Sequence, residues 1–131
     1  LLAECHLSLG SLLEKQQKPA EAEQQIRQGL DVLRKLSGEN PSVPGYACDL
    51  AVGHVRFGGI LREQRKGAEA EGSYRDALKI LDALVQRHPK MVSVLYSLAM
   101  THGELSSLMQ AIGQRKQAEN HHREAVRIVQ A

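Results

Sequence analysis

The sequence is poor in aromatic residues and has no tryptophan. Aromatic side chains make up 3% of the 131 residues, whereas hydrophobic residues make up 42%. Leucine, valine, isoleucine and alanine must therefore build the interior. This composition suits close packing of helix against helix, and it argues against a β-sandwich, in which aromatic and β-branched strands would dominate. At this length the chain can bury one domain's core.

Cysteine and long apolar runs are also scarce. The two cysteines, Cys5 and Cys48, match no CxxC spacing of a metal or redox site. Both lie inside helical patterns, which favours free thiols buried in helices. No stretch approaches the ~18 uncharged apolar residues of a membrane-spanning helix. We therefore expect a cytoplasmic protein that does not associate with membranes.

Neither sign of charge is in excess. The chain has 17 basic and 15 acidic residues and a formal net charge of +2. A balanced chain offers no electrostatic case for nucleic acid or anionic membrane as a partner. A helical repeat that reads RNA would also need base-reading side chains at fixed positions, and Glu4, Val52 and Met100 argue against that function.

What the sequence does contain is an internal repeat. Leu2, Leu50 and Leu98 lie 48 residues apart, each followed by alanine, and no gap is needed to hold this register. A fixed period of this kind is typical of stacked helical repeats. The same spacing relates further groups of residues: His6, His54 and His102; Ala22, Ala70 and Ala118; Arg27, Arg75 and Arg123; Pro41 and Pro89.

Apolar periodicity and breakers predict six helices in three antiparallel hairpins, with repeats at about 1–45, 46–89 and 90–131. Because Leu1 already lies inside a repeat, we expect a single domain that is part of a longer array. Val92 stands where the first repeat has Pro44, so the fifth helix is expected to begin earlier than its counterpart. The predicted helices are 1–17, 19–36, 46–65, 68–87, 90–112 and 116–130, with turns at 37–45, Lys66-Gly67, His88-Pro89 and Gly113.

Small residues recur where two helices of a hairpin should cross. Glycine costs roughly 0.5–1 kcal/mol inside a helix relative to alanine, so its recurrence needs a packing reason. Close contact between helices supplies that reason. We expect Gly10, Gly58 and Ser106 to face Ala22, Ala70 and Ala118, with Leu13, Leu61 and Met109 filling the surrounding space.

These positions resemble the tetratricopeptide repeat, whose pattern is W-x2-L-G-x2-Y followed by A-x3-F. The resemblance implies an all-α, right-handed superhelical α-solenoid that acts as a protein-interaction scaffold without catalysis. The period of 48 exceeds the family's usual 34. The chain also looks like the long-period repeats appended to planctomycete-type bacterial serine/threonine kinases, so the parent protein could carry a kinase domain. The matching residues are His6, Leu9, Gly10, Leu13, Ala22, Ile26 and Gly29 in repeat one, His54, Phe57, Gly58, Leu61, Ala70, Tyr74 and Ala77 in repeat two, and His102, Leu105, Ser106, Met109, Ala118, His122 and Ala125 in repeat three.

The resemblance also implies a binding surface. In the family, the first helix of each repeat lines a concave groove that holds an extended peptide or a partner helix. The Lys and Asn set that clamps a peptide's terminal carboxylate in some members is missing, so we expect a rather apolar groove. The alternative is that Val52, Val55 and Met100 only touch neighbouring helices. The predicted groove comprises Glu4, Leu7, Ser11, Glu14, Val52, Val55, Gly59, Arg62, Met100, Gly103, Ser107 and Gln110.

The histidines do not predict a metal site. His6, His54 and His102 occupy equivalent positions about one helix spacing apart, roughly 10 Å, which is too far for shared coordination at ~2.1 Å. They are better explained as core or hairpin-contact residues. His121 and His122 point about 100° apart on one helix and cannot chelate together. No nucleophile, base and orienting group come together in the pattern, so we expect no cofactor and no catalysis.

Two functions remain open. The first is a module that binds a protein or peptide in the groove. The second is a structural spacer or self-association segment within a larger array. Terminal repeats of solenoids usually carry polar caps. The first predicted helix, with Leu2, Leu9 and Leu12, and the sixth, with Val126, Ile128 and Val129, do not look strongly capped.

Overall fold

Consecutive antiparallel helices make up the part of the chain that the structure describes. This structure is a computed structural model and describes Gly10 and residues 18–130. No strand occurs among these residues, which confirms the all-α class. The predicted first helix lies outside the described residues. The helices are α2 (Pro19–Glu39), α3 (Pro44–Glu63), α4 (Gly67–Arg87), α5 (Val92–Ala111) and α6 (Arg115–Gln130).

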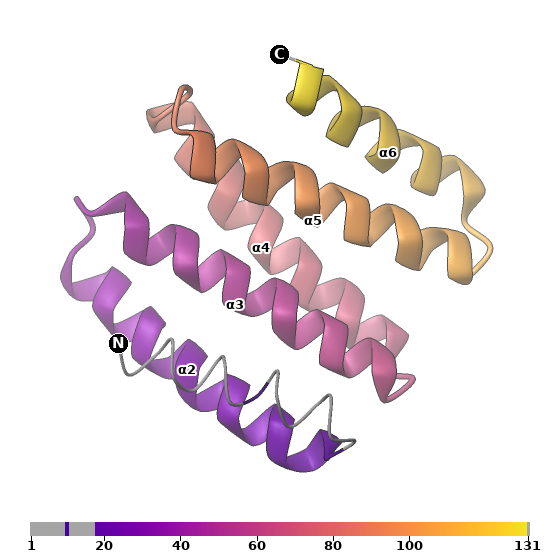
Figure 1. Ribbon diagram of the computed structural model, residues 1–131, viewed down its shortest axis with the longest axis horizontal. Coiled ribbons are helices and arrows are strands. Elements are labelled where there is room, and N and C mark those ends of the chain that lie inside the picture. The colour runs from indigo at the N-terminus through magenta and orange to yellow at the C-terminus, as the bar shows by residue number, and fades with distance from the viewer. Residues whose placement is uncertain (1–9, 11–17, 131) are drawn as a thin grey trace.

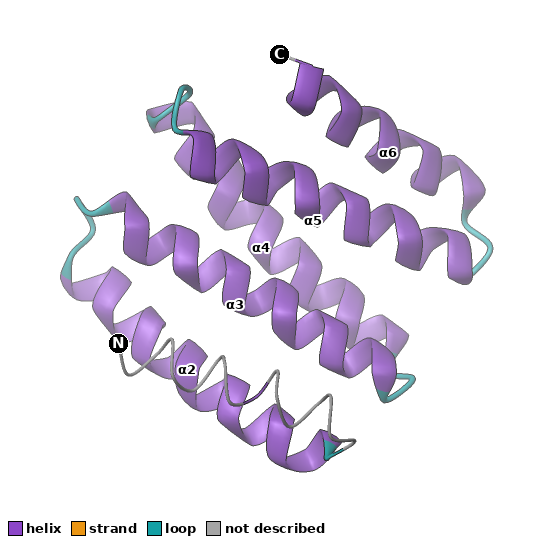
Figure 2. Cartoon of the chain, in the orientation of Figure 1, coloured by secondary structure: helices purple, strands orange, loops and turns teal. Residues whose placement is uncertain are grey.

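Each helix packs against the next along the chain, and α3 also contacts α5. Short loops join the helices (Figure 2). In Figure 1, α3 and α5 lie in front of α4, so that the first helices of two repeats form one layer and the second helix of the middle repeat lies behind them. This layering is the arrangement of a helical solenoid, as the period predicts.

The 48-residue register of the sequence holds in the helix boundaries. Helix α2 covers 19–39 and α4 covers 67–87, while α3 covers 44–63 and α5 covers 92–111. The prediction that the fifth helix begins earlier than its counterpart is therefore wrong. Met91 is extended, with φ −78° and ψ 108°, so α5 begins at Val92, one period after Pro44. The connector between α2 and α3 is also shorter than predicted, because α2 continues through Gly38.

The turns inside the hairpins use the left-handed backbone region. Arg65 has φ 62°, and Gly113, one period later, has φ 82°. The following residue in each turn donates its backbone N–H to a carbonyl five residues back: Lys66 to Leu61 and Gln114 to Met109, both at 2.8 Å. These bonds satisfy carbonyls at the helix end. The turn between α3 and α4 therefore lies at Arg65, one residue before the predicted Lys66-Gly67, and Gly67 already belongs to α4.

Among the described residues, the core consists of two clusters of mainly aliphatic side chains, and one of them contains a tyrosine. The smaller joins α2 to α3 and contains Ile26, Leu30 and Leu33 packed with Leu50 and Ile60. The larger joins α3, α4 and α5 and extends to Ala118 on α6. Cys48 is a free, buried thiol in this larger cluster, as expected.

The recurring glycines make room for a larger residue than the sequence suggests. A Cβ atom on Gly58 would lie 2.6 Å from Cε1 of Tyr74, whose side chain is fully buried. A Cβ atom on Gly10 would lie 2.7 Å from Cγ1 of Ile26 and 3.1 Å from the Ala22 carbonyl oxygen. The close approach therefore involves Ile26 and Tyr74, which lie four residues after Ala22 and Ala70, and not the alanines alone.

Candidate partner-binding surface

The predicted groove positions that the structure describes lie on the adjacent helices α3 and α5. Those of the first repeat, Glu4, Leu7, Ser11 and Glu14, lie outside the described residues. Gly103, Ser107 and Gln110 are exposed on α5, and Gly59 and Arg62 are half-buried on α3. A Cβ atom added to Gly59 or Gly103 would meet no atom of the described residues within 4 Å. The backbone of both helices is therefore open at these two points.

The apolar positions of the predicted groove lie deeper. Val55 is 8% exposed and belongs to the larger core cluster, and Met100 is half-buried against that cluster. Val52 is also half-buried. The exposed part of the surface consequently offers glycines, a hydroxyl, an amide and a guanidinium. Repeat spacing alone could not separate these two sets, because both lie on the same two helices.

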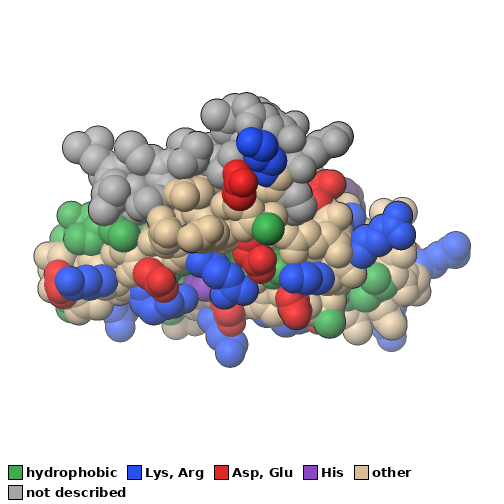
Figure 3. Space-filling model, turned by 90° about the horizontal axis from the view of Figure 1, so that it is seen from below, with side chains coloured by type: hydrophobic (Ala, Val, Ile, Leu, Met, Phe, Trp, Pro, Cys, Tyr) green, Lys and Arg blue, Asp and Glu red, His purple; other side chains and the backbone are tan. Residues whose placement is uncertain are grey.

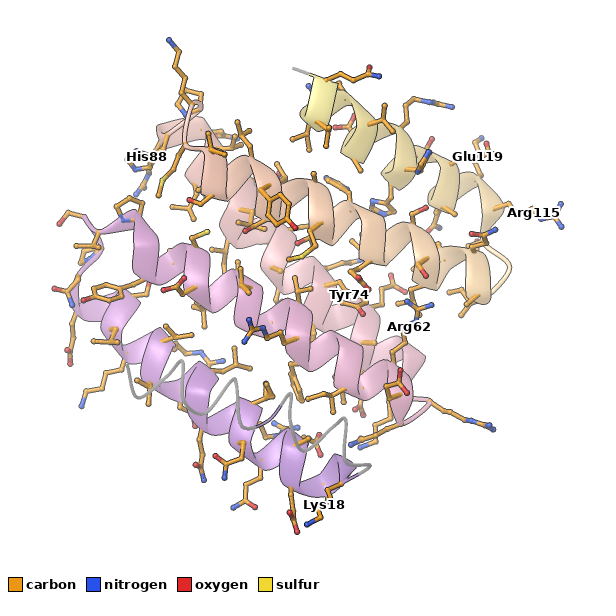
Figure 4. All side chains as sticks on the ribbon, viewed as in Figure 1. Lys18, Arg62, Tyr74, His88, Arg115 and Glu119 are labelled. Atoms are coloured by element: carbon orange, nitrogen blue, oxygen red, sulfur yellow. The ribbon has the colours of Figure 1, made fainter. Side chains whose placement is uncertain are left out.

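Arg62 connects α3 to α5 across this surface. Its Nη2 donates to Oγ of Ser107 at 3.0 Å, and its Nη1 lies 3.9 Å from Oε2 of Glu104. The hydroxyl of Tyr74 in turn donates to the same carboxylate oxygen of Glu104 at 3.5 Å. Figure 4 shows Arg62 and Tyr74 close together. A set of polar contacts thus joins three helices at the edge of the core.

Burial and charge keep the Tyr74 hydroxyl protonated. Desolvation first, and the nearby Glu104 carboxylate second, raise the pKa of Tyr74 to about 12. The phenol therefore acts only as a donor toward Glu104 at neutral pH. Position in the repeat did not predict Glu104 or Tyr74 for this surface. The repeat gives no signal for this pair, because Glu104 lies 42 residues after Arg62 and not one period of 48.

The described histidines of the repeat register, His54 and His102, are a buried residue and a hairpin contact. His54 is buried on α3, and Nδ1 of His102 on α5 lies 3.0 Å from Nδ1 of His121 on α6. Burial is the main cause that lowers the pKa of all three imidazoles, and for His121 the neighbouring His102 lowers the pKa further. One imidazole of the contacting pair must be neutral to accept the hydrogen bond.

Within the described part of the chain, no group of three or more His, Cys, Asp or Glu residues could hold a metal ion. Among the same residues, no helix is both long and apolar enough to cross a membrane. On the face seen from the α2 side, basic and acidic side chains are interspersed (Figure 3). That face therefore forms no patch of one sign, in keeping with the nearly balanced net charge.

Comparison with known proteins agrees with this fold. Residues 2–42 match the family described as tetratricopeptide repeat. The crystal structure of BtubC (BKLC) from P. vanneervenii is similar, with a TM-score of 0.73 and 22% sequence identity over 98% of this chain. The chain spans 46% of the length of that protein. No curated protein matches the chain. The resemblance to tetratricopeptide repeats, and with it an α-solenoid built of helical repeats, is thus confirmed.

Proposed function

We propose that this chain is a protein-interaction module that holds an extended peptide or a partner helix across α3 and α5. Tetratricopeptide repeats generally mediate protein–protein interaction, and all-helical repeats of this type are generally non-catalytic. The location on α3 and α5 is our own inference. The observation that carries it is the contact between Arg62 and Ser107, each of which lies about one helical turn after an open glycine position, Gly59 on α3 and Gly103 on α5.

The chemistry of this surface favours a ligand rich in hydrogen-bond acceptors. The guanidinium of Arg62 and the hydroxyl of Ser107 are donors, and the exposed amide of Gln110 can donate and accept. Glycine at positions 59 and 103 allows a peptide backbone to approach the helices closely. Carbonyl groups or a carboxylate of the ligand would then compete with Glu104 for Arg62, which lies 3.9 Å from it.

The experiment is to select peptides from a random display library against the chain and to measure their affinity by calorimetry. Arg62→Glu should weaken binding about tenfold or more, because a hydrogen bond to a charged group contributes roughly 1.5–3 kcal/mol. Ser107→Asp should weaken the binding of acidic peptides in particular, because the new carboxylate repels them. Lys79→Glu, at an exposed position of α4, serves as the matched control and should leave the affinity unchanged.

Two results would count against this function. If no peptide binds, the chain is not a peptide-binding module. If peptides bind and Lys79→Glu affects them more than Arg62→Glu, the surface on α3 and α5 is not the binding site.

The second candidate function is a spacer or self-association segment. One observation favours it: large apolar side chains are exposed near the C-terminal end of the repeats, with Tyr96 69% exposed and Val129 76% exposed. The two functions use different surfaces and are therefore compatible.

A further inference from the structure

A polar hollow lies where α3 packs against both α2 and α4. We name the meeting of these three helices the first junction, and the meeting of α4, α5 and α6, one period later, the second junction (Figure 1). The hollow of the first junction has a volume of about 260 Å³. Small-molecule sites usually measure ~300–1,000 Å³, so this size favours a single side chain or ring as the occupant. The lining includes Arg27, Arg34, His54, Phe57, Ser73 and Asp76.

Two nearly buried polar side chains open into this hollow. His54 is 9% exposed and Ser73 is 7% exposed, and both line it. Neither side chain hydrogen-bonds to a described residue. Among the described residues, no side-chain polar atom is both buried and without a hydrogen-bond partner. The polar atoms of His54 and Ser73 therefore reach the hollow, where an occupant can bond to them.

The second junction shows which group fits beside the repeat histidine. His54 and Ser73 correspond to His102 and His121 one period later. Nδ1 of His121 lies 3.0 Å from Nδ1 of His102, and the two ring centroids are 5.2 Å apart. The imidazole of His121 thus fills, beside His102, the space that the short side chain of Ser73 leaves beside His54.

The arginines of the hollow do not make it a site for an anion. Arg27 pairs with Glu23 at 3.2 Å, and its Cζ lies 4.8 Å from the centroid of the Phe57 ring. Arg34 pairs with Asp31 at 3.1 Å. A phosphate or a carboxylate would have to compete with these two acids for the guanidinium groups. The hollow therefore favours a ligand without a negative charge.

The remaining polar groups match the two nitrogens of an imidazole. Burial first, and Arg34 as well, lower the pKa of His54, whereas Asp76 raises it, and the net shift is downward. His54 is therefore neutral at neutral pH and has one nitrogen that donates and one that accepts. The carboxylate of Asp76 accepts only. An imidazole can bond to His54 through one nitrogen and donate to Asp76 through the other.

We infer that the hollow of the first junction binds the imidazole ring of a histidine from a partner protein. One ring nitrogen bonds to His54 and the other donates to Asp76, while the hydroxyl of Ser73 lines the same space. The ring takes the place that His121 fills in the second junction. This site does not depend on Arg62 or Ser107, so it is separate from the proposed surface on α3 and α5.

The test is an NMR titration of the full chain, labelled with nitrogen-15, with an end-blocked Gly-His-Gly tripeptide. An end-blocked Gly-Phe-Gly tripeptide is the ligand control, because its ring has no nitrogen. We expect the histidine peptide to shift the backbone amide signals of His54 and Ser73 and to leave that of His102 unchanged. The phenylalanine peptide should shift none of the three.

Two substitutions exchange the character of the two junctions. Ser73→His fills the hollow with the side chain that the second junction carries, so the peptide should no longer shift the signal of His54. His121→Ser opens the equivalent space beside His102, so a second set of shifts should appear there. Circular dichroism checks that both variants keep the helical content of the wild type.

A milder pair of variants tests the acceptor. Asp76 and Asp82 are both exposed on α4, and only Asp76 lines the hollow. Asp76→Asn should weaken peptide binding roughly five- to tenfold, because a hydrogen bond to a charged group is stronger than one to a neutral group. Asp82→Asn should leave the affinity unchanged. This comparison decides the question even if Ser73→His does not fold.

Three results would overturn the inference. The histidine peptide shifts neither His54 nor Ser73, which would mean that water alone fills the hollow. Ser73→His folds and binds the peptide as the wild type does. Asp82→Asn weakens binding as much as Asp76→Asn does. Arg62→Glu should leave this titration unchanged, so that failure here is distinct from failure of the surface on α3 and α5.

Discussion

Replacing Gly58 by alanine tests whether the contact between α3 and α4 depends on the absence of a side chain. The new Cβ atom would lie 2.6, 2.8 and 3.0 Å from three ring atoms of Tyr74. The ring cannot move into solvent, because Tyr74 is 0% exposed. Overpacking of this kind typically costs about 1–3 kcal/mol, while the helix itself gains roughly 0.5–1 kcal/mol from alanine. We expect a net loss of about 0.5–2 kcal/mol in the free energy of unfolding.

The neighbouring residue provides a matched control. Gly59 lies in the same helix, and a Cβ atom added there would meet no atom of the described part of the chain within 4 Å. Gly59→Ala should therefore stabilise the chain by roughly 0.5–1 kcal/mol through helix propensity alone. Both free energies are measured by urea denaturation followed by circular dichroism, with a check that the denaturant slope is unchanged.

The two alanine substitutions should thus change the free energy of unfolding in opposite directions. If Gly58→Ala stabilises the chain as much as Gly59→Ala does, the packing of Tyr74 against Gly58 is refuted. A second comparison isolates the ring. In a Tyr74→Leu background the penalty of Gly58→Ala should shrink, since the aromatic atoms that meet the new Cβ atom are gone, and such non-additivity is the expected result for residues in contact.

Three further predictions concern stability. Burial lowers the pKa of His102 and His121 below 6.5, so the unfolded chain binds more protons than the folded chain at acidic pH. The free energy of unfolding should therefore fall as the pH drops from 6.5 through the lowered pKa values. His121→Gln should reduce this pH dependence in urea titrations. Arg65→Gly should stabilise the chain by about 1 kcal/mol, because Arg65 has φ 62°, whereas Gly113→Ala, at φ 82°, should destabilise it by about 1–2 kcal/mol in the same assay. Ser106→Ala should cost about 0.5–1.5 kcal/mol, because Oγ of Ser106 donates to the Ala118 carbonyl at 2.8 Å; an unchanged unfolding free energy would contradict this contact.

The proposed binding surface was only partly predictable. Position in the repeat correctly placed Arg62 and Ser107 on neighbouring first helices, and the structure adds their 3.0 Å hydrogen bond. Repeat position could not distinguish Val55, which is 8% exposed, from Gly103, which is exposed. These two residues are equivalent by sequence, but the first helix of the next repeat, α5, packs beside α3, whereas the described residues contain no first helix that follows α5.

The sequence by itself determined the helices and their register. Apolar periodicity, prolines and glycines act within a few residues of chain, so the 48-residue period sets both α2 and α4 and both α3 and α5 at equivalent boundaries. Only the tertiary structure decided which equivalent residues are buried and which are open, as in Tyr74 and His122. The physical reason is that burial depends on the helix that packs across from a residue, and that helix belongs to a different repeat.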